Sequence, residues 1–300
     1  MKKLNLIIAL TIIACSCNDI KQNSDYVNTF IGTGGHGHTY PGASLPFGMM
    51  QLSPDTRLEG WDGCGGYHFS DSIIYGFSHT HLSGTGISDY GDVLLMPTRG
   101  EIQLTNGVKE SLTSKKTINQ LGYGSKFSHS NETSSPGYYQ VFLEDYNINV
   151  ELTTSIRSGI HKYTFNSKDS ANLILDLKHR DKLLKYKINI IDSLTISGFR
   201  YSSEWAREQR IHFIIKLSHP FKKYILNDEE NILGLSFGKI EEALITKVAI
   251  SSVDSLGALE NLKEIKDLNF NQCLNNAEKT WDNQLKKIDI NTKSEKKKEE

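Results

Sequence analysis

The sequence lacks a large net charge of either sign. Its 34 lysines and arginines nearly balance its 35 aspartates and glutamates, so the formal net charge is -1 and the pI is about 6.8. Without a basic field the chain has no long-range attraction for phosphate backbones, and we expect no nucleic acid partner. The Lys-rich stretch 293–300, KSEKKKEE, is balanced by its own glutamates and is typical of a solvated tail.

Cysteine is also scarce, with four residues in the whole chain. Cys15 and Cys17 lie close together near the N-terminus, whereas Cys64 and Cys273 are far apart in segments of different character. Two such isolated cysteines make neither a disulfide framework nor a zinc site, although one bond between them stays open.

The apolar run at the N-terminus is too short to cross a bilayer comfortably. Two lysines precede residues 4–14, LNLIIALTIIA, which have the length of a signal-peptide core. The sequence Ile12-Ile13-Ala14-Cys15 has the form of a bacterial lipobox. We therefore predict a lipoprotein signal peptide over 1–17, with the lipid on Cys15 or alternatively on Cys17; an ordinary secretory signal is the other interpretation. A polar tether over 18–25 follows, and the exported protein would be held to a membrane in the periplasm, the outer membrane or the cell surface.

A helix is also missing where one glycine motif would need it. The stretch GTGGHG fits the dinucleotide-binding fingerprint G-x-G-x-x-G with Gly32, Gly34 and Gly37, after a possible short strand at 26–31, YVNTFI. That fingerprint requires a helix whose N-terminus faces the pyrophosphate. Pro41 and Pro46 prevent a helix in the residues that follow. We therefore expect these glycines to permit tight backbone turns rather than to bind a nucleotide.

Glycine and aromatic residues are abundant in one part of the chain. Residues 26–98 hold fourteen of the 24 glycines and five of the ten histidines, with aromatic residues throughout. This mixture predicts tightly turned loops between short strands.

From about residue 100 the pattern changes to strands. Apolar residues alternate at 139, 141 and 143 and again at 148, 150 and 152, on either side of a turn at 145–147. The run 172–177, NLILDL, is typical of a buried strand, and further runs follow to residue 253. The spacing predicts an all-β domain over 26–256, built as a large antiparallel β-sandwich.

The C-terminal part has helical spacing instead. Its apolar residues recur at 268, 270, 274, 277, 281, 285 and 288, which predicts one or two helices ending near Leu285. We interpret residues 257–300 as a helical linker that follows the sandwich.

Two histidine pairs are candidates for metal binding. If His36-x-His38 and His79-x-His81 lay on strands, each pair would project to one face, and the two pairs could supply four nitrogens. The alternative is that these histidines donate hydrogen bonds that stiffen loops. We favour the second interpretation, because no cysteine or acidic residue repeats at a recognised ligand spacing, and we assign no metal ligand.

Acidic residues are plentiful in the glycine-rich part, and two of them could supply the acid and base of a glycoside hydrolase. Aspartates next to glycine are more often turn residues that bond the local backbone, and no G-x-S-x-G elbow is present. We therefore assign no catalytic residue. The candidates are Asp55, Glu59, Asp62, Asp71, Asp89 and Asp92.

Trp61 has two open interpretations. It stands among loop residues, in TRLEGWDGCGGYHFSD. It is either a core residue or an exposed platform on which a sugar ring can stack.

Several long segments together resemble one family. They are 30–56, FIGTGGHGHTYPGASLPFGMMQLSPDT; 60–100, GWDGCGGYHFSDSIIYGFSHTHLSGTGISDYGDVLLMPTRG; 135–165; 196–221; and 280–290, TWDNQLKKIDI. In this order they resemble the N-terminal domain of glycoside hydrolase family 92, whose members are mostly exo-acting α-mannosidases. The resemblance implies a galactose-mutarotase-like supersandwich, a linker helix and then an (α/α)6-barrel catalytic domain, which this sequence lacks.

The resemblance also implies a function. The chain would complete the sugar pocket of a calcium-dependent, inverting α-mannosidase, whose acid, base and calcium ligands lie in the barrel and not in this chain. By the same resemblance Phe30 and Gly32 should line the terminal-sugar site of an α-mannoside glycan, and Trp61 is the candidate for the leaving-group side. The alternative is a stand-alone carbohydrate-binding surface lipoprotein without hydrolase activity.

Overall fold

The computed structural model describes residues 22–57, 60–106, 122–166, 168–227, 231–288, 290–294 and 297. The predicted signal peptide with Cys15 and Cys17, most of the tether and Glu59 therefore lie outside the described residues. No helix in the described part is long and apolar enough to cross a bilayer.

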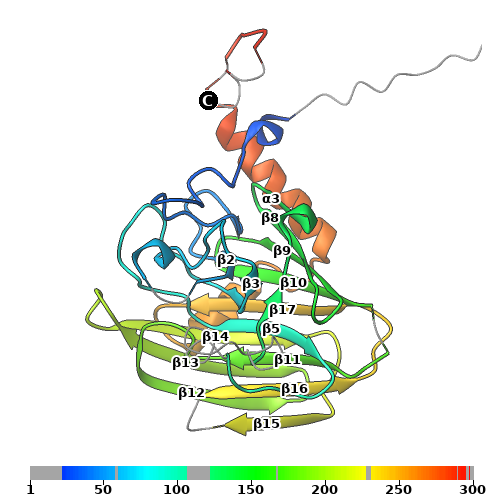
Figure 1. Ribbon diagram of the computed structural model, residues 1–300. Coiled ribbons are helices and arrows are strands. Elements are labelled where there is room, and N and C mark those ends of the chain that lie inside the picture. The colour runs from blue at the N-terminus through cyan, green and yellow to red at the C-terminus, as the bar shows by residue number, and fades with distance from the viewer. Residues whose placement is uncertain are drawn as a thin grey trace, which may run out of the picture.

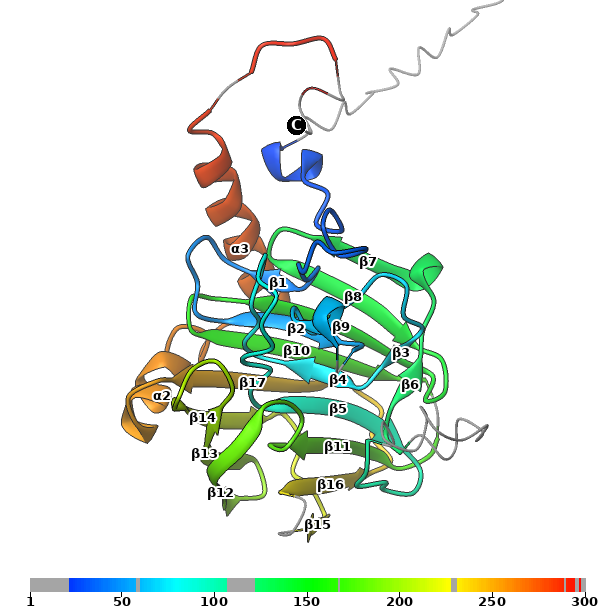
Figure 2. The same cartoon turned by 60° about the vertical axis from the view of Figure 1, so that its left-hand side comes forward.

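Two antiparallel sheets packed face to face form the body of the molecule (Figures 1 and 2). The eight-stranded sheet has the order β12 (Lys182–Asp192), β13 (Thr195–Ser203), β14 (Gln209–Leu217), β17 (Leu244–Ser251), β10 (Ser158–Phe165), β9 (Ile148–Thr154), β8 (Tyr138–Leu143) and β7 (Glu132–Ser135). The seven-stranded sheet has the order β1 (Ala43–Ser44), β2 (Gln51–Asp55), β4 (Gly76–Ser78), β5 (Leu94–Arg99), β11 (Ala171–Asp176), β16 (Ile232–Gly238) and β15 (Lys223–Asn227). A small ribbon pairs β3 (Ile73–Ile74) with β6 (Ser125–Lys126). The predicted antiparallel β-sandwich is confirmed.

Strand alternation places the core residues as predicted. In β8, Tyr139, Val141 and Leu143 are buried, and Val141 pairs directly with Val150 of β9. The turn between them contains Asn147 at φ +52, a left-handed conformation that asparagine tolerates better than most residues. All six residues of β11 are buried, because this strand lies inside the seven-stranded sheet. The buried run at 172–177 is therefore also confirmed as a strand.

Two helices cover part of the eight-stranded sheet. Helix α2 (Ser255–Leu262) contacts β17 and β14, and its residues share a second apolar cluster with Ile160 and Ile214 of the sheet. Helix α3 (Phe270–Leu285) begins with a capping box in which Asn269 and Gln272 bond each other's backbone N–H groups. The predicted helices are confirmed, including the end of the second at Leu285.

Helix α3 also binds the N-terminal segment, which lies beside it in Figures 1 and 2. The Ser24 N–H donates to the Asp282 carboxylate at 3.0 Å, and the Trp281 indole N–H donates to the Ser44 carbonyl at 2.7 Å. The 3₁₀ turn η1 (Asn23–Tyr26) forms at this contact, and local turn bonds follow it to Thr33. The possible strand over 26–31 is therefore wrong, because the backbone of this segment forms local turns. Its contact with the edge strand β7 is a side-chain bond, from the Thr29 hydroxyl to Ser134 at 2.7 Å.

The connections of residues 26–93 gather at one end of the sandwich, and we call them the loop layer (Figure 1). They include the 3₁₀ turn η2 (Trp61–Gly63), while η4 (His129–Asn131) lies next to β7. The expectation of turned loops between short strands is confirmed, since β1 to β4 have two to five residues each.

A buried ion pair fastens the loop layer to the sandwich. Asp92 lies at the end of the loop layer, and its carboxylate pairs with the fully buried Arg200 guanidinium of β13 at 2.5 Å. The Thr80 hydroxyl donates to the same carboxylate at 2.7 Å, and Arg200 also donates to the Leu177 carbonyl at 2.8 Å. Buried charges are tolerated only when they are paired and hydrogen-bonded in this way.

We predict that Arg200→Met lowers the free energy of unfolding by about 3–5 kcal/mol, because it leaves the Asp92 carboxylate buried without its cation. The matched control is Arg210→Met on the adjacent strand, whose pair with Glu208 is exposed and should change stability by less than about 1 kcal/mol. Denaturant unfolding of the variants checks both values. Equal losses would show that the buried pair has no special role.

Candidate functional site

Glycine lets the first loop close on itself. Gly32 has φ +82, and its carbonyl accepts the Thr39 N–H at 3.2 Å. A Cβ on Gly37 would lie 2.1 Å from the Gly32 carbonyl oxygen, so only glycine fits there. No helix lies between Gly37 and β1 in the described chain. The glycine motif is therefore a closed turn, as expected, and it is not followed by the helix that the nucleotide fingerprint requires.

The turn η2 presents Trp61 at the surface. Its side chain is 59% exposed, which excludes the core interpretation. The indole lies 5.5 Å from the His36 ring and 4.6 Å, edge to face, from the His38 ring. The backbone of Gly86 also lies close to the indole. A Cβ on Gly86 would be 2.0 Å from the indole nitrogen, so only glycine fits at this position. The tryptophan is thus exposed but held in a fixed orientation.

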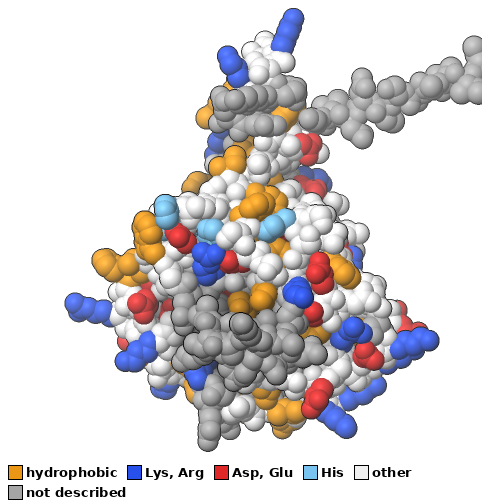
Figure 3. Space-filling view, viewed as in Figure 1, with side chains coloured by type: hydrophobic (Ala, Val, Ile, Leu, Met, Phe, Trp, Pro, Cys, Tyr) orange, Lys and Arg blue, Asp and Glu red, His pale blue; other side chains and the backbone are white. Residues whose placement is uncertain are grey.

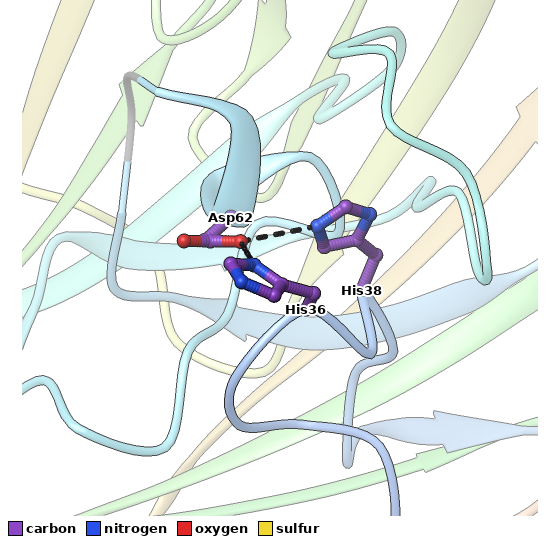
Figure 4. Close-up of side chains that lie close together, drawn as sticks. All are labelled: His36, His38 and Asp62. Carbon is purple, nitrogen blue, oxygen red and sulfur yellow. Dashed lines mark hydrogen bonds and ion pairs between the residues drawn. The ribbon is translucent and has the colours of Figure 1, made fainter.

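His36, His38 and Asp62 converge on one another (Figure 4), and both histidine rings contact Trp61. The His36 Nδ1 and the His38 Nε2 lie 2.6 Å and 3.3 Å from the same carboxylate oxygen of Asp62. The hydrogen bond from His36, followed by that from His38, lowers the pKa of Asp62 below its usual value. The carboxylate is therefore ionised and holds two imidazoles from a loop more than twenty residues earlier in the chain.

The second histidine pair has a different role. His79 and His81 follow β4 rather than lying on it, so the idea of two pairs on strands is wrong. His79 Nδ1 donates to the Val93 carbonyl at 2.6 Å, while its Nε2 meets the His161 Nε2 at 2.9 Å; His161 Nδ1 in turn accepts from the Tyr163 hydroxyl at 2.7 Å. Burial lowers the pKa of His79 to about 4 and that of His161 well below its usual value, so both are neutral at pH 7. These bonds agree with the interpretation that His79 stiffens the loop after β4.

His81 belongs to a buried cluster around Asp55. Its Nδ1 donates to the Gln51 carbonyl at 2.7 Å, and its Nε2 lies 3.2 Å from Asp55. His179 forms a second ion pair with Asp55 at 3.1 Å. Burial alone would raise the pKa of Asp55, but the electrostatic attraction of the neighbouring His81 and His179, together with the hydrogen bond from His81, holds it well below its usual range.

The other candidate aspartates of the described residues also have partners. Most of these partners are side chains far away in sequence, whereas turn chemistry predicted bonds to the local backbone. Asp71 pairs with Arg57 at 2.5 Å, and Asp92 pairs with Arg200. Asp89 accepts the Ala206 N–H at 3.2 Å. These contacts give Asp55, Asp71, Asp89 and Asp92 structural roles. Asp62 instead bonds the two histidines that contact the exposed tryptophan.

The three predicted sugar-binding residues all lie in the loop layer. Phe30 is half-buried and packs edge to face on Phe69 at 6.0 Å, and Phe69 stacks on His129 at 4.1 Å. Gly32 lies in the closed turn between Phe30 and the histidine pair, and Trp61 stands beside that pair. The structure places these residues on one layer, and their contact with a sugar stays a prediction.

Sequence reasoning missed two exposed apolar residues of the same layer. Phe47 is 95% exposed and holds φ +60, and Ile31 is 69% exposed. Figure 3 shows hydrophobic and histidine side chains next to one another on this face. Exposed apolar side chains that gather in this way mark an interaction surface, and a strained bulky residue is typical of functional loops. The sequence signal that could have found Phe47 is its place between Pro46 and Gly48.

The chemistry of the site does not fit calcium. Among the described residues, His36, His38 and Asp62 form the one group of three or more potential metal ligands, with their ligand atoms within 4.8 Å of one another. Calcium takes six to eight oxygen ligands, whereas this group offers two imidazole nitrogens and a carboxylate. The residues present are therefore not a calcium site.

Comparison with known proteins identifies the domain. Residues 26–259 match the model of the glycosyl hydrolase family 92 N-terminal domain. A family GH92 α-mannosidase from Bacteroides thetaiotaomicron is 34% identical with a TM-score of 0.85, over 93% of this chain and 40% of that one; the same enzyme has also been solved in complex with mannoimidazole. A second family GH92 mannosidase from that organism, 23% identical, shares the fold with a TM-score of 0.76 over 93% of this chain and 38% of its own.

A curated relative extends the match to a fungus. An uncharacterized secreted glycosidase from Arthroderma benhamiae is 30% identical over 141 residues, which is 47% of this chain and 17% of that protein. The chain thus spans less than half the length of each of these relatives. The larger part of each relative has no counterpart here.

We predict that Gly37→Ala destabilises the loop layer by about 2 kcal/mol or more, because its Cβ would collide with the Gly32 carbonyl. Gly34→Ala is the control: its Cβ would make an ordinary 3.7 Å contact with Phe69, and stability should change by about 0.5 kcal/mol or less. Thermal unfolding measures both effects. A tolerated Gly37→Ala would mean that the closed turn is not required.

Proposed function

The chain belongs to glycosyl hydrolase family 92, with the N-terminal domain of that family, and we propose that it forms one wall of an α-mannoside site. In this proposal it positions the sugar, and the acid and base come from the part of the family's enzymes that has no counterpart in this chain. The 34% identical relative is an α-mannosidase, which supports mannosides as the substrate class.

One observation carries this proposal: the fixed, exposed indole of Trp61 beside polar side chains. A pyranose presents C–H groups that pack on an aromatic face and hydroxyls that need hydrogen-bond partners. Trp61 offers the face, and His36 and Asp62 offer donors and acceptors within the same few ångströms. The closed glycine turn next to them allows the main chain to approach a ligand closely.

The carboxylates of this chain support placing the acid and base of the reaction elsewhere. Inverting hydrolysis needs one carboxylic acid to protonate the leaving oxygen and one carboxylate to activate water, with about 6.5–9.5 Å between them. Asp55, Asp71 and Asp92 are bound in ion pairs that would be broken by such a role. The family resemblance implies calcium for the complete enzyme, where it would hold the mannose, and the donor set described above does not provide that site.

We predict no hydrolysis of α-mannobiose by the purified chain with calcium present, since the acid and base are assigned to other residues. Released mannose above the uncatalysed background would contradict the assignment of the acid and base to residues outside this chain.

Calorimetry with the same disaccharide tests whether this chain binds the sugar. A half-site should bind more weakly than millimolar, whereas millimolar or tighter binding that Trp61→Ala removes would favour the stand-alone carbohydrate-binding lipoprotein. Trp205→Ala is the matched control, because this tryptophan is 76% exposed in another loop.

We also propose export as a lipoprotein, on the N-terminal sequence alone. Cys15 follows Ile12-Ile13-Ala14 in the lipobox pattern, and surface attachment would suit an enzyme that acts on glycans outside the cell. In a bacterial host fed labelled palmitate, Cys15→Ser should abolish labelling and Cys17→Ser should retain it. Labelling lost only with Cys17→Ser would move the lipid to the second cysteine, and no labelling of the unaltered chain would end the proposal.

A further inference from the structure

We propose that His36, His38 and Asp62 form a binding site for a divalent transition metal ion of the Zn²⁺ type. Two imidazole nitrogens and one carboxylate oxygen are a common ligand set for such ions, and a fourth position stays open to solvent or to a ligand. The argument for this site does not rest on the proposed function, although His36 and Asp62 are the same residues that we place beside the sugar.

The first argument is geometric. The two nitrogens lie 2.6 Å and 3.3 Å from one Asp62 oxygen, and the whole group fits within 4.8 Å. Metal–ligand bonds of about 2.0–2.2 Å place tetrahedral ligands about 3–3.5 Å from one another, so small side-chain rotations are enough. The His36 side chain is 74% exposed, so it has room for that adjustment within its contact with Trp61.

The second argument is that the backbone holds His38 in place. His38 has φ +55, a conformation that a residue with a side chain adopts at a cost. The Gly84 N–H donates to the His38 carbonyl at 2.8 Å, and a Cβ on Gly65 would lie 3.2 Å from the same oxygen. The buried His38 ring is thus aimed at Asp62 by the main chain of two other loops. Such pre-positioning of one ligand is what a metal site requires.

The third argument concerns Asp62 and Trp61. Asp62 lies in the turn η2. Arg180 donates to the Gly63 carbonyl of that turn at 3.0 Å, and this bond holds the turn in place. The Trp61 indole packs on both imidazoles and limits their rotation. A bound ion would join the 36–38 loop to the 61–63 turn and stiffen the surface where we place the sugar.

The test uses the purified chain without a histidine tag, stripped of metal with a chelator. Co²⁺ is the probe, because its visible absorption reports coordination and it quenches a nearby tryptophan. We expect one Co²⁺ per chain with an affinity of about 10 µM or tighter, displaced by Zn²⁺ and not by a hundredfold excess of Ca²⁺. Trp61→Phe should remove most of the quenching and leave the absorption band.

Three variants decide the assignment. His36→Ala removes a largely exposed ligand and should leave the fold intact, and Asp62→Asn keeps the shape while losing the charge. Each should weaken Co²⁺ binding at least about tenfold. His219→Ala, far from the cluster in sequence and bonded to Ser218, should bind as the unaltered chain does. Absence of one-to-one binding, or full binding by His36→Ala, would overturn the site.

Discussion

Buried charges hold the loop layer in place on the sandwich. Asp92 and Arg200 are 108 residues apart in sequence, and both are fully buried in their ion pair. Asp55 is likewise buried between His81 and His179. A buried charge that loses its partner costs several kcal/mol, so these groups are stable in one arrangement of the chain. Loops with little regular structure of their own thereby gain a fixed position.

The surface cluster follows from this buried layer. A Cβ on Gly66 would lie 2.2 Å from the Asp55 carboxylate, so the chain after η2 rests directly on the buried aspartate. The Thr56 N–H donates to the Gly66 carbonyl at 2.8 Å, and Arg180 donates to the Gly63 carbonyl of the turn. Trp61 and Asp62 inherit their orientation from these bonds. Glycines at these close contacts are therefore part of the site, since any side chain would push the turn away from its support.

The loop layer carries exposed apolar side chains at the surface of the molecule, and the proposed sugar site would use this surface. Trp61, Phe47 and Ile31 are exposed on it, while the adjoining helix α3 is fastened to the same layer through Trp281 and Ser44. The proposed metal site lies on this surface. It offers two imidazole nitrogens and one carboxylate, whereas calcium prefers a full set of oxygen ligands. The two ions would therefore not compete for the same residues.

Local sequence patterns were enough to predict the elements whose signals lie within a few neighbouring residues. Alternation at 139–143 and 148–152 predicted two paired strands, helical spacing predicted the helix that ends at Leu285, and prolines after the glycine motif excluded a nucleotide loop. Only the tertiary structure decided which distant groups meet: Asp92 with Arg200, His79 with His161, and Asp62 with His36 and His38. It also replaced the expected strand at 26–31 by a turn docked on α3. Periodicity is a property of neighbouring residues, whereas the pairing of buried charges and the convergence of ligands depend on contacts between residues far apart in the chain, which no local pattern contains.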